Sequence, residues 1–276
     1  MYHSVDRVFQ FPEYPYSYRG ICTCRGEHEP AGVTISIGGE IGEVGGKNST
    51  VEELRAYMDG FNRSRDRAKP GMSKISVQTG TAHGGFVMPD GSVRTDVKID
   101  VDTLGELSKV GRKEYGMGGA VQHGASTLPA EAFHNFPRVG ACEIHLATDF
   151  QNMVYEHQAF PPALKSEMYD WVRANAADER KAKDTEEQFL YKSRKKAIGA
   201  FKRQLWDLPA DVKDAIGKSL EDRFAFLLKQ LNVPGTADVV QRTVKLPPVH
   251  IDRQADVVAA GGTITAAERK AEGLHD

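Results

Sequence analysis

The chain has 276 residues but only three cysteines, Cys22, Cys24 and Cys142. An odd, sparse set excludes the disulfide framework of small secreted domains and favours a reducing compartment, so we expect a cytoplasmic protein. Cys22 and Cys24 could form half of a metal site, but no second pair follows at the spacing of structural zinc sites. The cysteines therefore point to no particular function.

The sequence also lacks an excess of either charge and any long apolar run. Lysine and arginine number 36 against 38 acidic residues, a net charge of −2, so no global basic field recruits nucleic acid. No apolar run approaches the roughly 18 residues of a membrane span. Segment 1–20 lacks the basic and apolar regions of a secretory signal. We expect no nucleic-acid partner and no membrane partner.

The residues that are present change character along the chain, and we expect four segments. Residues 1–31 form an irregular leader in which tyrosines and prolines alternate. Residues 32–160 carry short β-branched segments that run into glycine or small polar residues, most of them followed by a helical pattern. Residues 161–231 are predicted to be helical. Residues 232–276 form a polar tail that is either partly disordered or wraps a neighbouring subunit.

Four segments have the composition of buried strands, and helical patterns alternate with them. The predicted strands are Val33–Ile37, Ile75–Gln78, Ala120–Gln122 and Ile144–Ala147. Thr50 and Glu53 form a capping box at one helix start, and Asp102 is predicted to cap a second helix. Pro129 suits the first turn of a short helix that ends near Gly140. Strand, turn and helix in repetition predict an α/β fold with a parallel sheet, whose site lies at the carboxyl ends of its strands.

After residue 150 the pattern is helical. Ala163–Ala176, Glu186–Leu205 and Asp211–Leu231 are typical of amphipathic helices with charged outer faces. The run Lys192–Lys196 is basic, but acidic residues balance it nearby. We interpret this run as a solvated helix face rather than a nucleic-acid site.

Histidines and a carboxylate stand at the ends of three predicted strands. Glu40 follows the first strand, His83 and Gly84 the second, and His123 and Gly124 the third. Glycine after each histidine lets backbone N–H groups approach an anion closely. Two histidines on neighbouring strands and a carboxylate on another supply the N,N,O ligands of a catalytic zinc, so His83, His123 and Glu40 are candidate ligands. A single histidine of this kind is more often a satisfied core or surface residue.

The end of the fourth predicted strand offers the hydroxyl of Thr148 and backbone donors at a helix start. Together with Gly124 and Ser126 these groups would form a phosphate cradle. Alternatively, Thr148 and Asp149 merely cap the helix that follows. The residues alone leave both interpretations open.

In order and spacing, these segments resemble the class II fructose-bisphosphate and tagatose-bisphosphate aldolases. The resemblance covers roughly residues 32–205. It rests on the segments Gly80–Gly84, His123–Ser126, Ala147–Asp149, Gly39–Gly42 and Gly45–Gly46. It implies a TIM barrel in which the four predicted strands are the fifth to the eighth.

The same resemblance implies a function. Zinc, or another divalent ion, would be held by His83 and His123 with Glu40 nearby. The activity would be reversible aldol cleavage of a phosphorylated ketose to dihydroxyacetone phosphate and an aldehyde, through a zinc-stabilised enediolate. The setting would be carbohydrate metabolism such as glycolysis. The phosphate end of the substrate would be bound by Gly84, Gly124, Ser126, Thr148 and Asp149.

The sequence departs from the family pattern in four places, one of which is Thr127 in place of a turn glycine. The family's Asp-His motif, which brings a catalytic aspartate and the first zinc histidine, occurs nowhere in the chain. Lys47 begins a non-acidic stretch where the family has acidic loop residues, which leaves Glu43 as the nearest substitute. His145 stands where the family has a substrate-contacting asparagine. His145 could donate to a substrate oxygen, supply a third metal ligand, reflect a changed substrate or be structural. Glu40, Glu43 and His145 are the candidate catalytic residues.

Because its predicted strands begin near Val33, the chain looks like the second half of a barrel. We expect unpaired sheet edges and an inward face of Ile, Val and Leu, which favour a homo-oligomer or a complementing half-barrel. The alternative function is a non-catalytic or degenerate aldolase-family subunit. Another phosphosugar enzyme, such as an epimerase or isomerase, has no local support.

Overall fold

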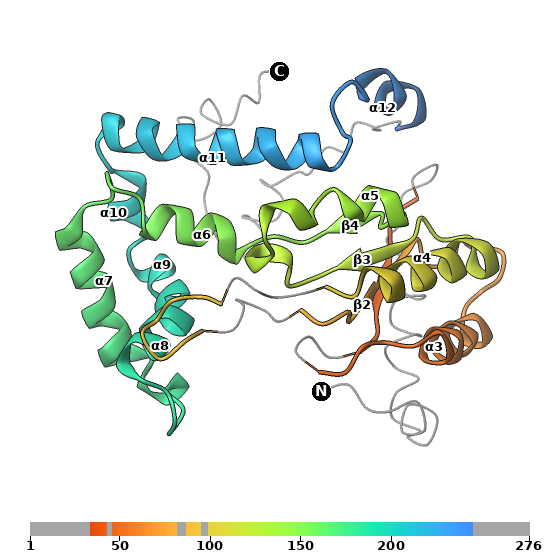
Figure 1. Cartoon of the computed structure of the whole chain (residues 1–276), viewed down its shortest axis with the longest axis horizontal. Coiled ribbons are helices and arrows are strands. Elements are labelled where there is room, and N and C mark those ends of the chain that lie inside the picture. Colours follow the sequence, from red (N-terminus) through yellow and green to blue (C-terminus); the bar gives the residue numbers. More distant parts are fainter. Residues whose placement is uncertain (1–33, 43–45, 82–86, 95–98, 245–276) are drawn as a thin grey trace, which may run out of the picture. The chain divides into compact units, whose positions relative to one another are not determined.

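A computed structural model describes residues 34–42, 46–81, 87–94 and 99–244 (Figure 1). The chain divides into two units, Met1–Pro234 and Gly235–Asp276. The first unit contains a parallel sheet, the helices packed on it and a group of further helices. The described part of the second unit is the short helix α12, Ala237–Thr243. Among the described residues, no helix combines the length and the apolar character that a membrane crossing requires.

Four strands form one parallel sheet in the order β1-β2-β3-β4, and the last three overlap the predicted strands. Their bounds are Gly38–Glu40, Lys74–Val77, Ala120–Gln122 and Glu143–Ile144. The predicted α/β class is therefore confirmed. The first strand lies later in the chain than its β-branched residues predicted, because Gly38 pairs with Lys74 and Glu40 with Ser76. Pairing to a neighbour, not local propensity, sets where this strand begins.

The two faces of the sheet differ in chemistry. Ile75, Val77 and Ala120 are at most 3% exposed and belong to the core shared with helices α3 and α4. Successive side chains of a strand point to opposite faces, so Lys74 and Glu143 lie on the other face, where they form an ion pair. The expected inward face of Ile, Val and Leu is found only in part. Val121 lies on that face, beside Ser76 and Glu143, whereas Ile75 and Val77 face the helices.

Helix α3, Val51–Ser64, begins as predicted. The Thr50 side chain accepts a hydrogen bond from the Glu53 backbone N–H, and the Glu53 carboxylate accepts one from the Thr50 N–H. Leu54 and Phe61 on its inner side are buried in the core. The capping box and the helical spacing are thus confirmed.

Helix α4, Val101–Tyr115, has Leu104 and Leu107 buried, as the pattern predicted. Its cap, however, is Asp100 rather than the predicted Asp102. The Asp100 carboxylate accepts hydrogen bonds from the Thr103 backbone N–H at 3.0 Å and from the Asn48 amide at 2.8 Å. Asp102 lies in the first turn, where its charge interacts with the helix dipole.

The segment between β3 and β4 is a series of short turns. It comprises the 3-10 helices η1 (Ala125–Thr127) and η2 (Ala130–Ala132) and helix α5 (Asn135–Val139). Pro129 precedes η2, and Gly140 ends α5 in the left-handed region with φ of 73°. The predicted stop at Gly140 is confirmed, while the predicted single helix is two short ones.

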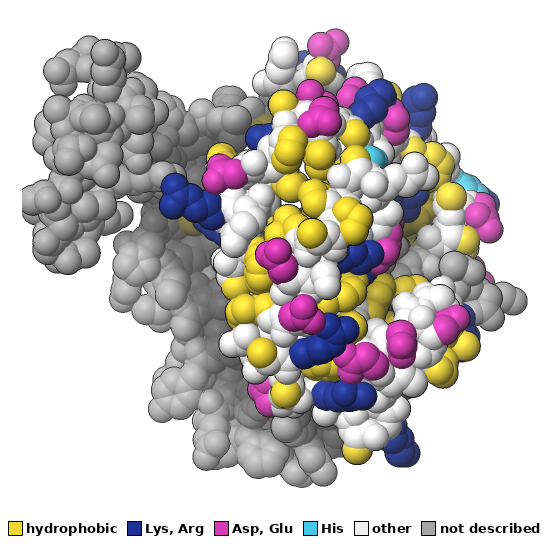
Figure 2. All heavy atoms as spheres, turned by 90° about the vertical axis from the view of Figure 1, so that its left-hand side faces the viewer, with side chains coloured by type: hydrophobic (Ala, Val, Ile, Leu, Met, Phe, Trp, Pro, Cys, Tyr) yellow, Lys and Arg dark blue, Asp and Glu magenta, His cyan; other side chains and the backbone are white. Residues whose placement is uncertain are grey.

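The second half of the unit is helical (Figure 1). Helices α7 and α11 match the predicted ranges to within one residue, but Glu186–Leu205 is broken into shorter pieces. The bounds are α6 Thr148–Tyr155, α7 Pro162–Asn175, η3 Ala177–Glu179, α8 Glu186–Ser193, η4 Arg194–Lys196, α9 Ala197–Ala200, α10 Lys202–Trp206 and α11 Ala210–Gln230. On the face shown in Figure 2, charged side chains of both signs alternate with hydrophobic ones.

The basic run Lys192–Lys196 is not the uniformly solvated face that its sequence predicted. Its lysines are exposed, but Arg194 is only 2% exposed. The helical path changes to a tight 3-10 turn at this residue, and the side chain enters the core of the helical half. The charges of nearby residues in the sequence could not predict the burial of Arg194, because its partners Asn152 and Glu156 lie in or next to α6.

Arg194 is held by aromatic rings and polar groups together. Its guanidinium carbon lies 4.7 Å from the Tyr155 ring centre and 4.6 Å from that of Tyr191. The same group donates to the Glu156 carboxylate and, at 2.7 Å, to the Asn152 side-chain oxygen. Because Tyr155, Glu156 and Asn152 belong to or adjoin α6, this cluster fixes α6 to α8.

Replacing Asp100 by Ala should lower the free energy of unfolding by about 1 kcal/mol, because the cap of α4 is lost. Asp102→Ala is the matched control and should cost less, since only a dipole interaction is lost. Hydrogen bonds from Thr103 hold the pKa of Asp100 below its usual 3.8, so its stabilisation is present above that pH and is lost as pH falls below it. Urea unfolding at pH 7 and pH 3 measures both effects. Equal losses in the two variants would contradict the assigned cap.

Replacing Arg194 by Met should lower the free energy of unfolding by about 2–3 kcal/mol, because two cation–π contacts and several hydrogen bonds to a buried guanidinium disappear. Arg203 has 92% of its side chain exposed, so Arg203→Met should change stability by less than about 0.5 kcal/mol. Chemical unfolding followed by circular dichroism compares the two variants. A loss at Arg194 no larger than that at Arg203 would show that the cluster is not stabilising.

Candidate functional site

His123 and His145 lie side by side at the carboxyl ends of β3 and β4. Gln122 pairs with Ile144 in the parallel register, so the next residues along the two strands are also neighbours on one face of the sheet. The ring centres of the two histidines are 4.3 Å apart and their planes differ by 29°. The structure thus brings together one predicted metal ligand and one predicted catalytic residue.

Glu143 joins this pair, although the sequence analysis did not select it. Its carboxylate contacts the Nε2 atom of His145 and the Nζ atom of Lys74. Burial raises the pKa of Glu143, but the bonds to His145 and Lys74 outweigh burial and hold the pKa below its usual value. The signal that could have found Glu143 is the strand period of two, which puts residues 143 and 145 on one face.

A buried amide network holds the backbone of His123. The Gln122 side chain is fully buried; its oxygen accepts from the Thr79 hydroxyl at 2.5 Å, and its nitrogen donates to the Thr81 hydroxyl at 3.0 Å. The His123 carbonyl accepts from the Gln122 amide at 2.6 Å and from the Thr81 hydroxyl at 2.7 Å. These bonds satisfy polar groups away from water and fix the end of β3 against the end of β2.

The residues predicted to form a phosphate cradle come together at the start of α6. Gly124 follows His123 in the left-handed region with φ of 68°, which turns the chain into η1. The Ser126 hydroxyl then accepts a hydrogen bond from the Ala147 backbone N–H at 3.1 Å. Thr148 is the first residue of α6, and no side chain caps this helix at Ala147. A helix N-terminus with this neighbour has the polarity that anions prefer.

Asp149 is engaged elsewhere. Its carboxylate accepts from the Arg223 side chain of α11 at 2.7 Å, and both side chains are about one-fifth exposed. The Arg223 guanidinium also lies over the rings of Phe133 and Phe226. This ion pair ties the first turn of α6 to α11, which runs alongside it (Figure 1).

Of the four remaining predicted site residues, the structure describes Glu40. Glu40 is the last residue of β1 and is partly buried opposite Ser76. Glu43, His83 and Gly84 lie outside the described residues. Within the described part of the chain, no group of three or more His, Cys, Asp or Glu side chains could hold a metal ion. The donor chemistry of His123 fits zinc, but the full ligand set includes His83, which the structure does not describe.

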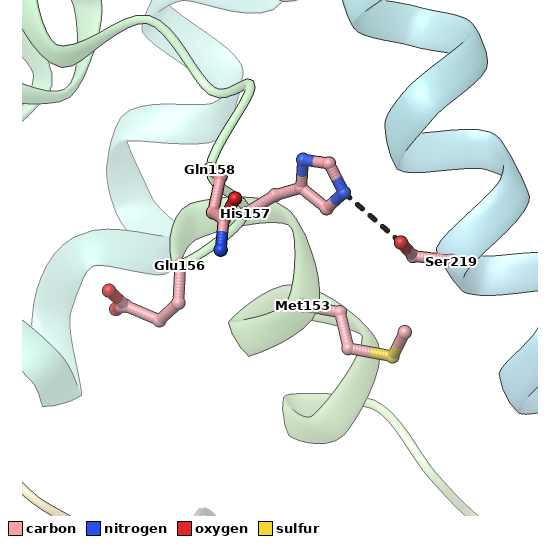
Figure 3. Close-up of a pocket in the computed structure, with 5 residues that line it drawn as sticks. All are labelled: Met153, Glu156, His157, Gln158 and Ser219. Atoms are coloured by element: carbon pink, nitrogen blue, oxygen red, sulfur yellow. Dashed lines mark hydrogen bonds between the residues drawn. The ribbon is translucent and has the colours of Figure 1, made fainter.

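A separate feature is a hollow of about 330 Å³ between the end of α6 and α11. Within it, His157 Nε2 and the Ser219 hydroxyl are 3.0 Å apart, while Glu156 points away from the ring (Figure 3). His157 Nδ1 accepts from the Ala159 backbone N–H, so in the neutral ring Nε2 carries the hydrogen and donates to Ser219. The ring therefore cannot take a proton from Ser219 through Nε2, and the pair links two segments rather than forming a nucleophile.

Comparison with known families gives a match that spans this site. The profile described as fructose-bisphosphate aldolase class-II matches residues 29–205, close to two thirds of the chain. The match covers the four strands, the start of α6 and helices α7 and α8.

Two solved structures are similar at low identity. One is a candidate fructose-1,6-bisphosphate aldolase from Coccidioides immitis, with 16% identity and a TM-score of 0.40, covering 84% of this chain. The other is a candidate tagatose 6-phosphate kinase from Sinorhizobium meliloti, with 19% identity and a TM-score of 0.37, covering 70% of this chain. The chain spans 62% and 52% of the lengths of these two proteins.

Proposed function

Because this chain belongs to the class II fructose-bisphosphate aldolase family, we propose that it takes part in reversible aldol cleavage of a phosphorylated ketose. The products would be dihydroxyacetone phosphate and an aldehyde. The observation that carries the proposal is that the chain after His123 turns into η1 and reaches the start of α6, where the Ser126 hydroxyl accepts from the Ala147 backbone N–H. The four βα units are consistent with part of a TIM barrel, in which sites lie at the carboxyl ends of the strands.

Zinc is the metal we propose, with His83, His123 and Glu40 as its ligands. When bound, zinc would act as a Lewis acid that polarises the ketose carbonyl. Glu43 and His145 are the groups we propose for proton transfer, because the acidic loop residues and the Asp-His motif are missing. His145 lies directly beside His123, which supports its assignment to the reacting end of the substrate.

The phosphate end of the substrate is proposed to bind where α6 begins. Gly84, Gly124, Ser126 and Thr148 would supply backbone N–H groups and hydroxyls to the phosphate oxygens. Asp149 would act with them by holding the first turn of α6 through its bond to Arg223. A carboxylate in that bond cannot donate to a phosphate, so its contribution would be to position the helix.

The chain is proposed to work in association with a second copy or with a complementing half-barrel. Among the described strands, β1 and β4 are the outer strands of the sheet, so each offers one side for further pairing. The sparse cysteines favour a cytoplasmic setting, in keeping with carbohydrate metabolism such as glycolysis.

We expect the chain to bind zinc and to release triose phosphate from fructose or tagatose bisphosphate in a coupled assay. His83→Ala and His123→Ala should lose zinc, and turnover should fall about 10³-fold, since Lewis-acid stabilisation is worth several kcal/mol. His134→Ala is the matched control, because His134 is exposed and lies outside this site. Metal analysis and the coupled assay measure both. Unchanged zinc content and activity in the His83 and His123 variants would refute the lyase proposal and favour a non-catalytic subunit.

Size-exclusion chromatography with light scattering should show a species larger than 30.4 kDa, because the edges of a short parallel sheet favour pairing. Adding a separately produced N-terminal aldolase half-barrel to the sample tests the complementing alternative. A monomer that unfolds cooperatively and does not bind the added half-barrel would contradict the association proposal.

A further inference from the structure

The Glu143 carboxylate contacts both Lys74 and His145. Lys74 is on β2 and Glu143 on β4, so the ion pair reaches across β3 on the face opposite the helices. The two side chains are 26% and 34% exposed, which leaves the contact partly shielded from water. An ammonium group on one carboxylate oxygen and an imidazole on the other hold the carboxylate in a fixed orientation.

This carboxylate fixes one edge of the His145 ring, and His123 fixes one face. Glu143 Oε1 meets Nε2 of the ring, while the stacked His123 ring lies 4.3 Å from it, centre to centre. Rotation about either side-chain bond of His145 would break at least one of these contacts. Two contacts from different directions therefore determine both the position and the plane of the ring.

The chemistry of the edge contact determines which nitrogen carries the hydrogen. An ionised carboxylate has no hydrogen to donate, so Nε2 of His145 must donate in this bond. In the neutral ring, Nδ1 is then the nitrogen without a hydrogen and can only accept.

We propose that Glu143 is a positioning residue that holds His145 as the Nε2-protonated tautomer, so that Nδ1 accepts a hydrogen bond from a hydroxyl of the substrate. This inference rests on the proposed function for the identity of the substrate, a phosphorylated ketose. It assigns His145 Nδ1 the role of hydrogen-bond acceptor, whereas donation from Nδ1 to a carbonyl or phosphate oxygen would need a hydrogen on that atom. A ligand that lacks the hydroxyl would leave Nδ1 unpaired and would bind less tightly.

The tautomer can be measured directly on the full chain labelled with ¹⁵N-histidine, at pH 8.5 where imidazole is neutral. Long-range ¹H–¹⁵N spectra distinguish a protonated from an unprotonated ring nitrogen, and His145→Gln identifies the signals of His145. The wild type should show a protonated Nε2 and an unprotonated Nδ1. Glu143→Gln should give a mixture of tautomers, because an amide can either accept or donate. Glu131→Gln replaces an exposed glutamate and should match the wild type.

Binding provides the second measurement. Dihydroxyacetone phosphate should bind the wild type about 5-fold more tightly than acetol phosphate, which lacks the hydroxyl, since one hydrogen bond separates the two ligands. In Glu143→Gln this preference should fall toward equality, while Glu131→Gln should retain it. A structural role for Glu143 would change both affinities alike.

Two results overturn the proposal: a wild-type His145 with hydrogen on Nδ1, or a Glu143→Gln spectrum identical to that of the wild type. Equal affinity of the wild type for the two ligands overturns the hydroxyl assignment. If neither ligand binds, the proposed function fails, and the wild-type spectrum still decides the role of Glu143. The spectrum of the unaltered chain keeps the test valid even if a variant does not fold.

Discussion

Parallel pairing in a fixed register is the constraint on which the candidate site depends. Gln122 lies opposite Ile144, so His123 and His145 emerge as neighbours on the same face of the sheet. A shift of one residue in either strand would send one of these rings to the opposite face, because the side-chain period of a strand is two. The buried Gln122 network, which bonds to the His123 carbonyl, helps to hold β3 in this position.

The helical half holds α6, whose first residues belong to the candidate site, near both of its ends. Arg194 binds Asn152 and Glu156 at the far end of α6, and Arg223 binds Asp149 at its first turn. Both arginines also lie over aromatic rings, which favour a guanidinium because it is planar and weakly hydrated. The two ends of α6 are therefore fixed independently, and the helix start stays beside Ser126, where a phosphate is proposed to bind.

The face of the sheet opposite the helices carries several polar side chains, and this bears on whether the four strands need a partner. Lys74, Ser76 and Glu143 occupy the face that a complete barrel would turn inward, while Ile75 and Val77 pack against the helices. Polar groups on the inner face need less cover from other apolar residues than the expected aliphatic face would. The proposal of association therefore depends mainly on the outer strands of the sheet, where backbone groups can still pair. It depends less on the burial of apolar surface.

The sequence by itself determined the features that depend on near neighbours in the chain. The capping box of Thr50 and Glu53, the stop at Gly140 and the alternation of strands with helices are local, and the ordered histidine and glycine segments identified the family. Tertiary structure alone decided the rest. Asp100 caps α4 in place of Asp102, Arg194 is buried, and Glu143 joins Lys74 to His145. The partners of Arg194 and Glu143 belong to other segments, which only the folded chain brings close. Asp100 bonds to the distant Asn48 as well as to Thr103 in its own helix.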